Sequence, residues 1–178
     1  MARPGRVVLA GAATGLLLVA FGKGMQTGTT PTASIVPESI DIPSIDVDAP
    51  LMKLGLSKDG EVELPPYEKP KVAGWYSGSA VPGEKGASVI IGHVDTKTAP
   101  AVFYKLRQLR KGETVKVERS DGKVVSFKVD HIEQVHKDSF PTRRVYLEDG
   151  LKLVTCGGKF DYAKGEYLDN IIVYASRA

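Results

Sequence analysis

Residues 151–158 read Leu-Lys-Leu-Val-Thr-Cys-Gly-Gly, and this stretch joins the strand pattern of the chain to its only cysteine. The apolar run over residues 151–154 predicts a β-strand. Cys156 follows at the predicted end of that strand, directly before two glycines that permit unusual backbone angles. The stretch therefore indicates a β protein that places a thiol at a strand end.

Further short strand-like runs, broken by turns, continue from about residue 38 onward. They cover residues 40–42, 61–64, 87–91, 114–117, 124–129, 151–154 and 171–174. Asp-Gly pairs at residues 59–60, 121–122 and 149–150 precede such runs, and Asp-Gly favours a two-residue hairpin turn because both positions tolerate positive φ. The pattern predicts a mainly antiparallel β domain, and the number of strands favours a closed barrel over a single open sheet.

One segment, residues 101–109, spaces its apolar side chains as a helix does. These side chains are Val102, Phe103, Leu106 and Leu109. Pro100 suits the first helical turn, and the Lys-Gly pair at residues 111–112 suits the end. We expect one short helix on the barrel wall.

The composition is typical of a single folded domain. The 178 residues are 42% hydrophobic and 25% charged, as in ordinary globular proteins. The net charge of +3 is small, and the basic residues are scattered. The sequence therefore predicts no nucleic-acid partner.

The N-terminus has the layout of an export element. Arg3 and Arg6 precede an apolar stretch over residues 7–22, which extends to Met25 and so approaches the roughly 20 residues of a membrane-spanning helix. We expect residues 1–25 to form an uncleaved transmembrane anchor with its basic end inside; a cleaved signal peptide is the alternative. Residues 26–37 are small and polar and predict a flexible linker.

The cysteine can be interpreted in several ways. A lone cysteine in an exported chain is a buried hydrophobe, an intermolecular bridge, a metal ligand or a nucleophile. A nucleophilic thiol needs a base or an ion-pair partner, because free cysteine titrates near about pH 8.5. His93 is the best candidate, because it also closes an apolar run beside a glycine. His131 and His136 are five residues apart, so a regular strand sends them to opposite faces and disfavours a shared zinc.

Several short motifs occur together in a fixed order. They are Ile42-Pro43-Ser44-Ile45, Ala73-Gly74-Trp75-Tyr76, Gly92-His93-Val94-Asp95 and Leu153-Val154-Thr155-Cys156-Gly157-Gly158. With the basic, apolar N-terminus, this order resembles the sortases over residues 38–177. Three further motifs are similar to the class F group of actinobacteria: Phe103-Tyr104-Lys105-Leu106, Phe140-Pro141-Thr142 and Tyr167-Leu168-Asp169-Asn170.

The resemblance implies a fold and a reaction. The fold is an eight-stranded sortase β-barrel with one or two short helices, outside a Gram-positive cell membrane on a single-pass anchor. The reaction is that of a cysteine transpeptidase without metal or organic cofactor. Cys156 matches the nucleophile and His93 the general acid/base. The substrates are secreted proteins with a Leu-Pro-x-Thr-Gly-like sorting signal, cleaved between Thr and Gly, and the acceptor is an amine of a peptidoglycan precursor or a pilin-type lysine in the cell wall.

One expected residue is missing. The family places an arginine near the start of the last strand, where this chain has Leu168. Lys164, Lys159 and Arg144 are candidates for the cation, and solvated loop charges are the alternative for all three. Two other functions stay open at this point: a non-catalytic envelope barrel for binding or assembly, and another thiol peptidase or transpeptidase.

Overall fold

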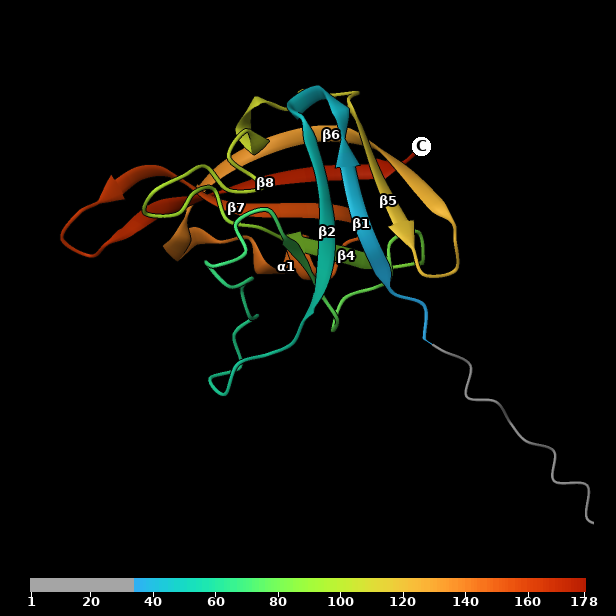
Figure 1. The fold of residues 1–178 in the computed structure, drawn as a ribbon, viewed down its shortest axis with the longest axis horizontal. Coiled ribbons are helices and arrows are strands. Elements are labelled where there is room, and N and C mark those ends of the chain that lie inside the picture. The colour runs from blue at the N-terminus through green and yellow to red at the C-terminus, as the bar shows by residue number, and fades with distance from the viewer. Residues whose placement is uncertain (1–33) are drawn as a thin grey trace, which may run out of the picture. The chain divides into compact units, whose positions relative to one another are not determined.

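The computed structural model describes residues 34–178, which form an eight-stranded closed barrel (Figure 1). The strands are β1 (Pro37–Ile42), β2 (Val47–Leu54), β3 (Ala73–Tyr76), β4 (Ala87–Ile91), β5 (Thr114–Arg119), β6 (Val124–His136), β7 (Gly150–Asp161) and β8 (Glu166–Arg177). Their order around the barrel is β1-β2-β3-β4-β7-β8-β6-β5. The β2–β3 and β4–β7 ladders are parallel and the others are antiparallel. The predicted mainly antiparallel closed barrel is confirmed.

The predicted anchor over residues 1–25 lies outside the described residues, as does most of the predicted linker over residues 26–37. Among residues 34–178, no helix has the length and apolar character needed to cross a membrane.

The three Asp-Gly pairs have different structural roles. Gly122 has φ 75° and turns β5 into β6, as predicted. Gly60 closes a small turn with one bridge, between Leu56 and Val62. The strand predicted over residues 61–64 is therefore wrong. Two prolines follow it at residues 65–66, and proline has no N–H to continue a ladder.

The third Asp-Gly pair opens β7 without a hairpin. Gly150 has φ 102°, and the Asp149 carboxylate accepts a hydrogen bond from the Gly86 N–H. A parallel pair such as β4–β7 needs a long crossover, which here includes β5 and β6. The sequence patterns also missed β2, which contains Pro50, and the four-residue β3.

The helix expected over residues 101–109 is only a 3₁₀ turn, η2 (Leu106–Gln108). The N–H groups at its start bond to other segments: Ala101 to the Val94 carbonyl and Val102 to the Pro70 carbonyl. Phe103 and Leu106 are fully buried, so the apolar spacing predicted correctly which side chains are buried but not the local backbone conformation.

The other helical segments are short. The α-helix α1 (Thr142–Tyr146), which the sequence patterns did not predict, begins directly after Pro141. Two further 3₁₀ turns are η1 (Pro43–Ile45) and η3 (Lys137–Ser139).

Two apolar clusters stabilise the barrel. One fills its interior and includes Ile40, Phe103, Val115, Phe127 and Leu153. The second lies on the outer face of β4, β7 and β8 beneath α1, and includes Val89, Ile91, Val145, Val154 and Ile172. Because β4 is buried on both faces, residues 87–91 are a continuous rather than an alternating apolar run. The outer cluster therefore supports β7, which carries Cys156, and β4, which ends two residues before His93.

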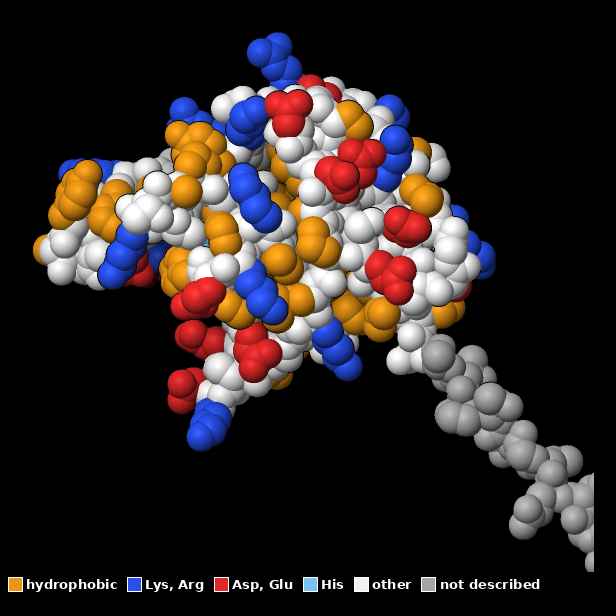
Figure 2. All heavy atoms as spheres, in the orientation of Figure 1, with side chains coloured by type: hydrophobic (Ala, Val, Ile, Leu, Met, Phe, Trp, Pro, Cys, Tyr) orange, Lys and Arg blue, Asp and Glu red, His pale blue; other side chains and the backbone are white. Residues whose placement is uncertain are grey.

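The surface drawn in Figure 2 carries mixed charge. Basic and acidic side chains are interspersed over this face rather than gathered in a patch of one sign. The β7–β8 hairpin extends beyond the barrel wall at the left of Figure 1.

Candidate active site

Cys156 lies within β7 rather than at its end. The strand continues to Asp161, so the prediction that the thiol stands at a strand end is wrong. The β7–β8 register instead shifts between Gly157 and Phe160, and Gly158 has φ 76°. The two glycines serve this bulge, because a Cβ on Gly157 would lie 2.7 Å from Ile171 Cγ1 and one on Gly158 would collide with the Asp169 carboxylate. The bulge comes directly after the thiol.

The parallel β4–β7 ladder brings His93 level with Cys156. Ile91 pairs with Val154, and the Gly92 N–H donates to the Val154 carbonyl at 3.1 Å. His93 and Cys156 each follow the Ile91–Val154 pair by two residues, His93 just after the end of β4 and Cys156 within β7. On the other side of β7, Cys156 pairs with Asn170 of β8.

Gly92 allows the close approach of the loop that follows. A Cβ at this position would lie 2.6 Å from Val102 Cγ1 and 2.7 Å from Phe103 Cδ2. The Phe103 N–H also donates to the His93 carbonyl at 3.0 Å. The glycine beside His93 is therefore a packing requirement of the 92–103 segment.

The His93 side chain is buried and held by the β2–β3 loop. The residue is 6% exposed, and Nε2 lies 2.6 Å from the Pro65 carbonyl oxygen. The Tyr67 ring stacks on it, with ring centroids 4.1 Å apart and an angle of 18° between the planes. The hydrogen bond to Pro65 restrains the ring at Nε2, and the stacked Tyr67 ring restrains it from one face.

Burial and nearby charges act on the Cys156 thiol. Burial raises its pKa most, and the carboxylates of Asp95 and Glu166 raise the pKa further. The ammonium group of Lys137 acts in the opposite direction. The resting site therefore favours the neutral thiol, and its thiolate depends on a proton acceptor and on the lysine.

A tyrosine and a carboxylate lie beside the thiol. The Tyr167 hydroxyl on β8 donates a hydrogen bond to Asp95 Oδ2. This bond to a carboxylate, together with burial, raises the pKa of Tyr167 to about 12. Tyr167 therefore acts as a hydrogen-bond donor at neutral pH.

The three cations singled out from the sequence lie in different places. Lys164 is exposed in the turn between β7 and β8, and Lys159 is exposed on β7 three residues beyond Cys156. Arg144 on α1 binds Glu133 at 2.8 Å, and its guanidinium lies 5.6 Å from the Tyr174 ring centroid. Tyr174 is four residues along β8 from Asn170, about 13 Å at strand spacing. The structure thus places Arg144 away from the level of Cys156.

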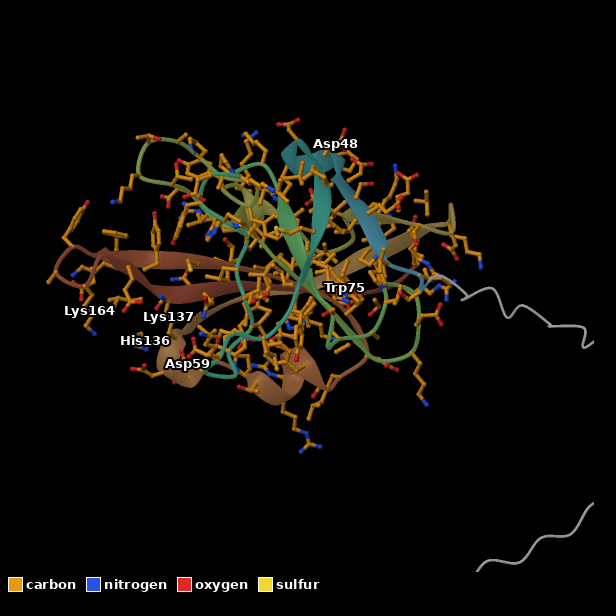
Figure 3. All side chains as sticks on the ribbon, turned by 60° about the horizontal axis from the view of Figure 1, so that its bottom comes forward. Asp48, Asp59, Trp75, His136, Lys137 and Lys164 are labelled. Atoms are coloured by element: carbon orange, nitrogen blue, oxygen red, sulfur yellow. The ribbon has the colours of Figure 1, made fainter. Side chains whose placement is uncertain are left out.

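A cation that the sequence patterns missed lies closer to the thiol. Lys137 follows β6 and forms an ion pair with Glu166, the first residue of β8, at 2.8 Å. Figure 3 shows Lys137 next to His136 at this end of the sheet. His136, the last residue of β6, pairs with Asp169 of β8, and Lys137 begins the 3₁₀ turn η3 directly after it. The only sequence signal for this cation was a lysine directly after the strand-like run over residues 130–136.

The other two histidines lie at different positions along one strand. Along β6, His131 pairs with Tyr174 and stacks on its ring at 4.4 Å, whereas His136 pairs with Asp169 five residues further. Within residues 34–178 no three His, Cys, Asp or Glu side chains are grouped as metal ligands would be.

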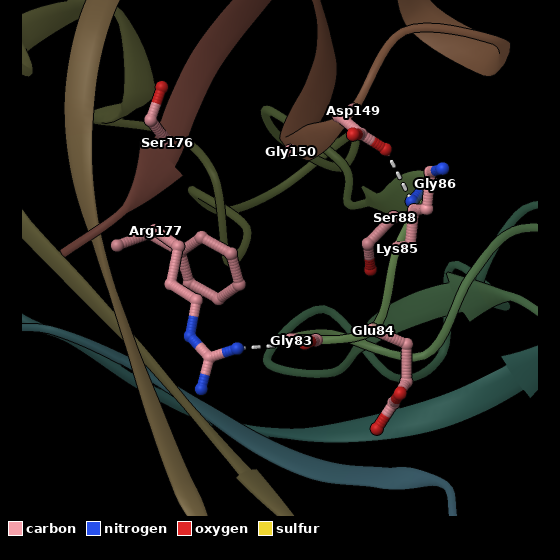
Figure 4. Close-up of a pocket in the computed structure, with 10 residues that line it drawn as sticks. Gly83, Glu84, Lys85, Gly86, Ser88, Asp149, Gly150, Ser176 and Arg177 are labelled. Carbon is pink, nitrogen blue, oxygen red and sulfur yellow. Dashed lines mark hydrogen bonds between the residues drawn. The ribbon is translucent and has the colours of Figure 1, made fainter.

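A cavity of about 380 Å³ lies away from this site, at the opposite end of the β4–β7 ladder, where Ala87 pairs with Gly150 (Figure 4). Arg177 donates to the Gly83 carbonyl across it at 3.2 Å. The Ser88 hydroxyl, also on its wall, is buried without a hydrogen-bond partner among the described residues. The cavity contributes nothing to the Cys156 site.

Comparison with known proteins identifies the fold. Residues 40–178 match the sortase domain family. Similar solved structures include sortase C-1 from Actinomyces oris (26% identity, TM-score 0.60, covering 79% of this chain and 72% of that one). Sortase C from Streptococcus pneumoniae is also similar, with 26% identity and a TM-score of 0.59, covering 80% of this chain and 68% of that one. Sortase C1 from Streptococcus agalactiae in complex with MTSET has 23% identity and a TM-score of 0.59, covering 79% of this chain and 66% of that one. No curated protein sequence matches the chain.

The chain belongs to the sortase family, a family of cysteine transpeptidases. It spans about two thirds of the length of the two streptococcal structures.

Proposed function

We propose that this chain is a membrane-anchored sortase of the class F group. It cleaves a Leu-Pro-x-Thr-Gly-like sorting signal between Thr and Gly and joins the acyl group to an amine. The observation that carries this proposal is the parallel β4–β7 register, whose last pair, Ile91 with Val154, stands two residues before His93 and two before Cys156. The described barrel offers no other thiol, because Cys156 is the only cysteine of the chain.

The reaction has two covalent stages. The Cys156 thiol gives its proton to the His93 ring, and the thiolate attacks the threonine carbonyl carbon. A C–S bond forms, the peptide C–N bond breaks, and His93 returns the proton to the departing glycine amine. An acceptor amine then attacks the thioester. The new amide forms as the C–S bond breaks, and the amine proton passes through His93 to the Cys156 sulfur.

The developing oxyanion needs donors beside the sulfur. The bulge leaves the β7 backbone between Gly157 and Phe160 outside the regular ladder with β8. Its N–H groups are the nearest main-chain donors along the chain from Cys156 and serve as the oxyanion site. Lys137, at the start of η3 directly after β6, supplies the positive charge.

The acceptor is an amine of a peptidoglycan precursor or a pilin-type lysine, and the donor is a secreted protein with the sorting signal. The pilin-type acceptor is supported by the similar sortase C from Streptococcus pneumoniae, whose structure is described in terms of pilin substrate specificity. Competing amines, a glycine-terminated peptide against a lysine-containing one, separate the two acceptors in the assay below.

Cleavage of a fluorogenic Leu-Pro-x-Thr-Gly peptide tests the proposal, with intact-mass analysis to detect the thioacyl adduct. We expect Cys156→Ala and His93→Ala each to lower kcat/KM by more than about 10³-fold, because the two residues act as a unit. His131→Ala is the matched control: this histidine also stacks on a tyrosine, yet it lies away from the thiol. Parent-like cleavage by Cys156→Ala, or cleavage at another bond, would contradict the proposal.

A further inference from the structure

We propose that Pro65 and Tyr67 of the β2–β3 loop are positioning residues that fix the tautomer and the orientation of His93. Through them, Nδ1 becomes the ring nitrogen that exchanges the proton. This inference rests on the proposed role of His93 in the transpeptidase reaction. It adds two residues that neither the motifs nor the family assignment singles out.

The hydrogen bond to Pro65 decides which nitrogen is free. A backbone carbonyl only accepts hydrogen bonds, so at 2.6 Å His93 Nε2 carries the proton and donates it. Nε2–H makes this bond in both the neutral and the charged ring. The proton taken from the thiol and given to the leaving amine therefore resides on Nδ1.

The Tyr67 ring fixes the orientation that the hydrogen bond leaves open. One hydrogen bond allows the imidazole to tilt about the donor axis, whereas a ring stacked at 4.1 Å and 18° restrains the plane. Tyr67 is 62% exposed while His93 is 6% exposed. The tyrosine thus covers the histidine from solvent on one face and contributes little to the barrel core.

The loop is itself held in place, which a positioning element requires. Consecutive prolines restrict the backbone at residues 65–66. Two turns follow, with Lys69 N–H donating to the Pro66 carbonyl and Val72 N–H to the Lys69 carbonyl. The Pro70 carbonyl accepts from the Val102 N–H at 2.7 Å, which ties the loop to the segment that also holds the His93 backbone.

The direct readout is the tautomer of His93, measured on the full chain in detergent by two-bond ¹⁵N–¹H correlation of ¹⁵N-histidine. We expect His93 to show a single Nε2–H tautomer when neutral. His131 is an internal control, because it is stacked but makes no ring hydrogen bond within residues 34–178. A His93 ring with the proton on Nδ1, or a tautomer mixture like that of a free ring, overturns the inference.

The kinetic readout uses Tyr67→Ala and Tyr67→Phe. Tyr67→Ala should lower kcat about two- to tenfold, the range of one aromatic stack, with KM within twofold of the parent. Tyr67→Phe keeps the ring and should retain the parent kcat. A rise in KM without a fall in kcat would make Tyr67 a substrate contact and overturn its positioning role.

The two proposals fail separately. If the peptide is not cleaved but His93 shows the single Nε2–H tautomer, the reaction is wrong and the positioning element stands. If the peptide is cleaved but the tautomer is mixed and Tyr67→Ala keeps the parent kcat, the reaction stands and the positioning element is wrong.

Discussion

At the level of single residues, the charge of Lys137 acts on the pKa of the Cys156 thiol. Burial disfavours the thiolate, and Asp95 and Glu166 disfavour it further. Lys137, paired with Glu166, is the group that favours it. Lys137 begins η3 directly after the last β6–β8 pair, His136 with Asp169, and Asp169 follows Leu168, the β8 position where the family pattern predicts a cation.

Removal of the Lys137 charge should raise the pKa of Cys156, because the thiolate loses its favourable partner. At pH 7, Lys137→Met should therefore slow alkylation of the thiol by iodoacetamide about 1.5- to 5-fold, as expected for a partly exposed charge. Lys137→Arg should keep the parent rate.

The same assay on Lys164→Ala, Lys159→Ala and Arg144→Ala tests the cations suggested by the sequence. A larger effect from one of these than from Lys137→Met would transfer the cation role to it. The pH dependence of alkylation gives the pKa of the thiol directly.

At the level of elements, α1 is attached to the sheet by one charged contact above an apolar cluster. Arg144 binds Glu133 on β6 and lies over Tyr174 on β8, whose hydroxyl also donates to Glu133 at 3.1 Å. Val145 packs into the cluster below. These contacts hold the helix against the strands next to the candidate site.

Glu133→Gln should lower stability in a pH-dependent way. The hydrogen bond from Arg144, together with a weaker effect of the hydrogen bond from Tyr174, lowers the pKa of Glu133 below its ordinary value of about 4.3. A depressed carboxyl pKa contributes stability above the unfolded-state pKa and loses it as the pH falls through the folded-state pKa. We expect a modest loss at pH 7, and the gap to the parent should close in more acidic solution.

Urea unfolding at pH 7 and at pH 3 measures this difference. Glu38→Gln, at an exposed position on β1, is the matched control. An equal loss at both pH values would show that the ion pair does not cause the effect.

At the level of the whole molecule, an N-terminal anchor would place the barrel at a membrane surface. We expect the full chain to remain with membranes after an alkaline carbonate wash. A variant without residues 1–25 should move to the soluble fraction and keep its peptide cleavage. Release of the full chain by carbonate would contradict the anchor.

The barrel was largely predictable from local patterns, and the exceptions have physical causes. β4 and β7 read as apolar runs because both faces are buried. β2 and β3 were missed because a central proline and a length of four residues hide their alternation. The 101–109 segment matched a helix in spacing, but its N–H groups bond to other loops.

The site was predictable only in part. Cys156 and His93 stand in motifs, so the resemblance marked them. Lys137 and Tyr67 stand in no such motif. The role of Lys137 depends on the β6–β8 pairing and that of Tyr67 on a loop that folds back over His93, and a local sequence pattern predicts neither arrangement. The glycines after Cys156 were noted, but their use in a bulge depends on Asp169 and Ile171 of the partner strand.

The parallel β4–β7 ladder also constrains when the enzyme becomes active during folding. His93 and Cys156 are more than sixty residues apart in the chain, and β5 and β6 lie between them in sequence. Closing so long a loop has a high entropic cost, so such pairings tend to form late. A nascent or partly folded chain therefore carries a thiol without this neighbour, and the proton transfer to His93 that we propose begins only once the barrel has closed.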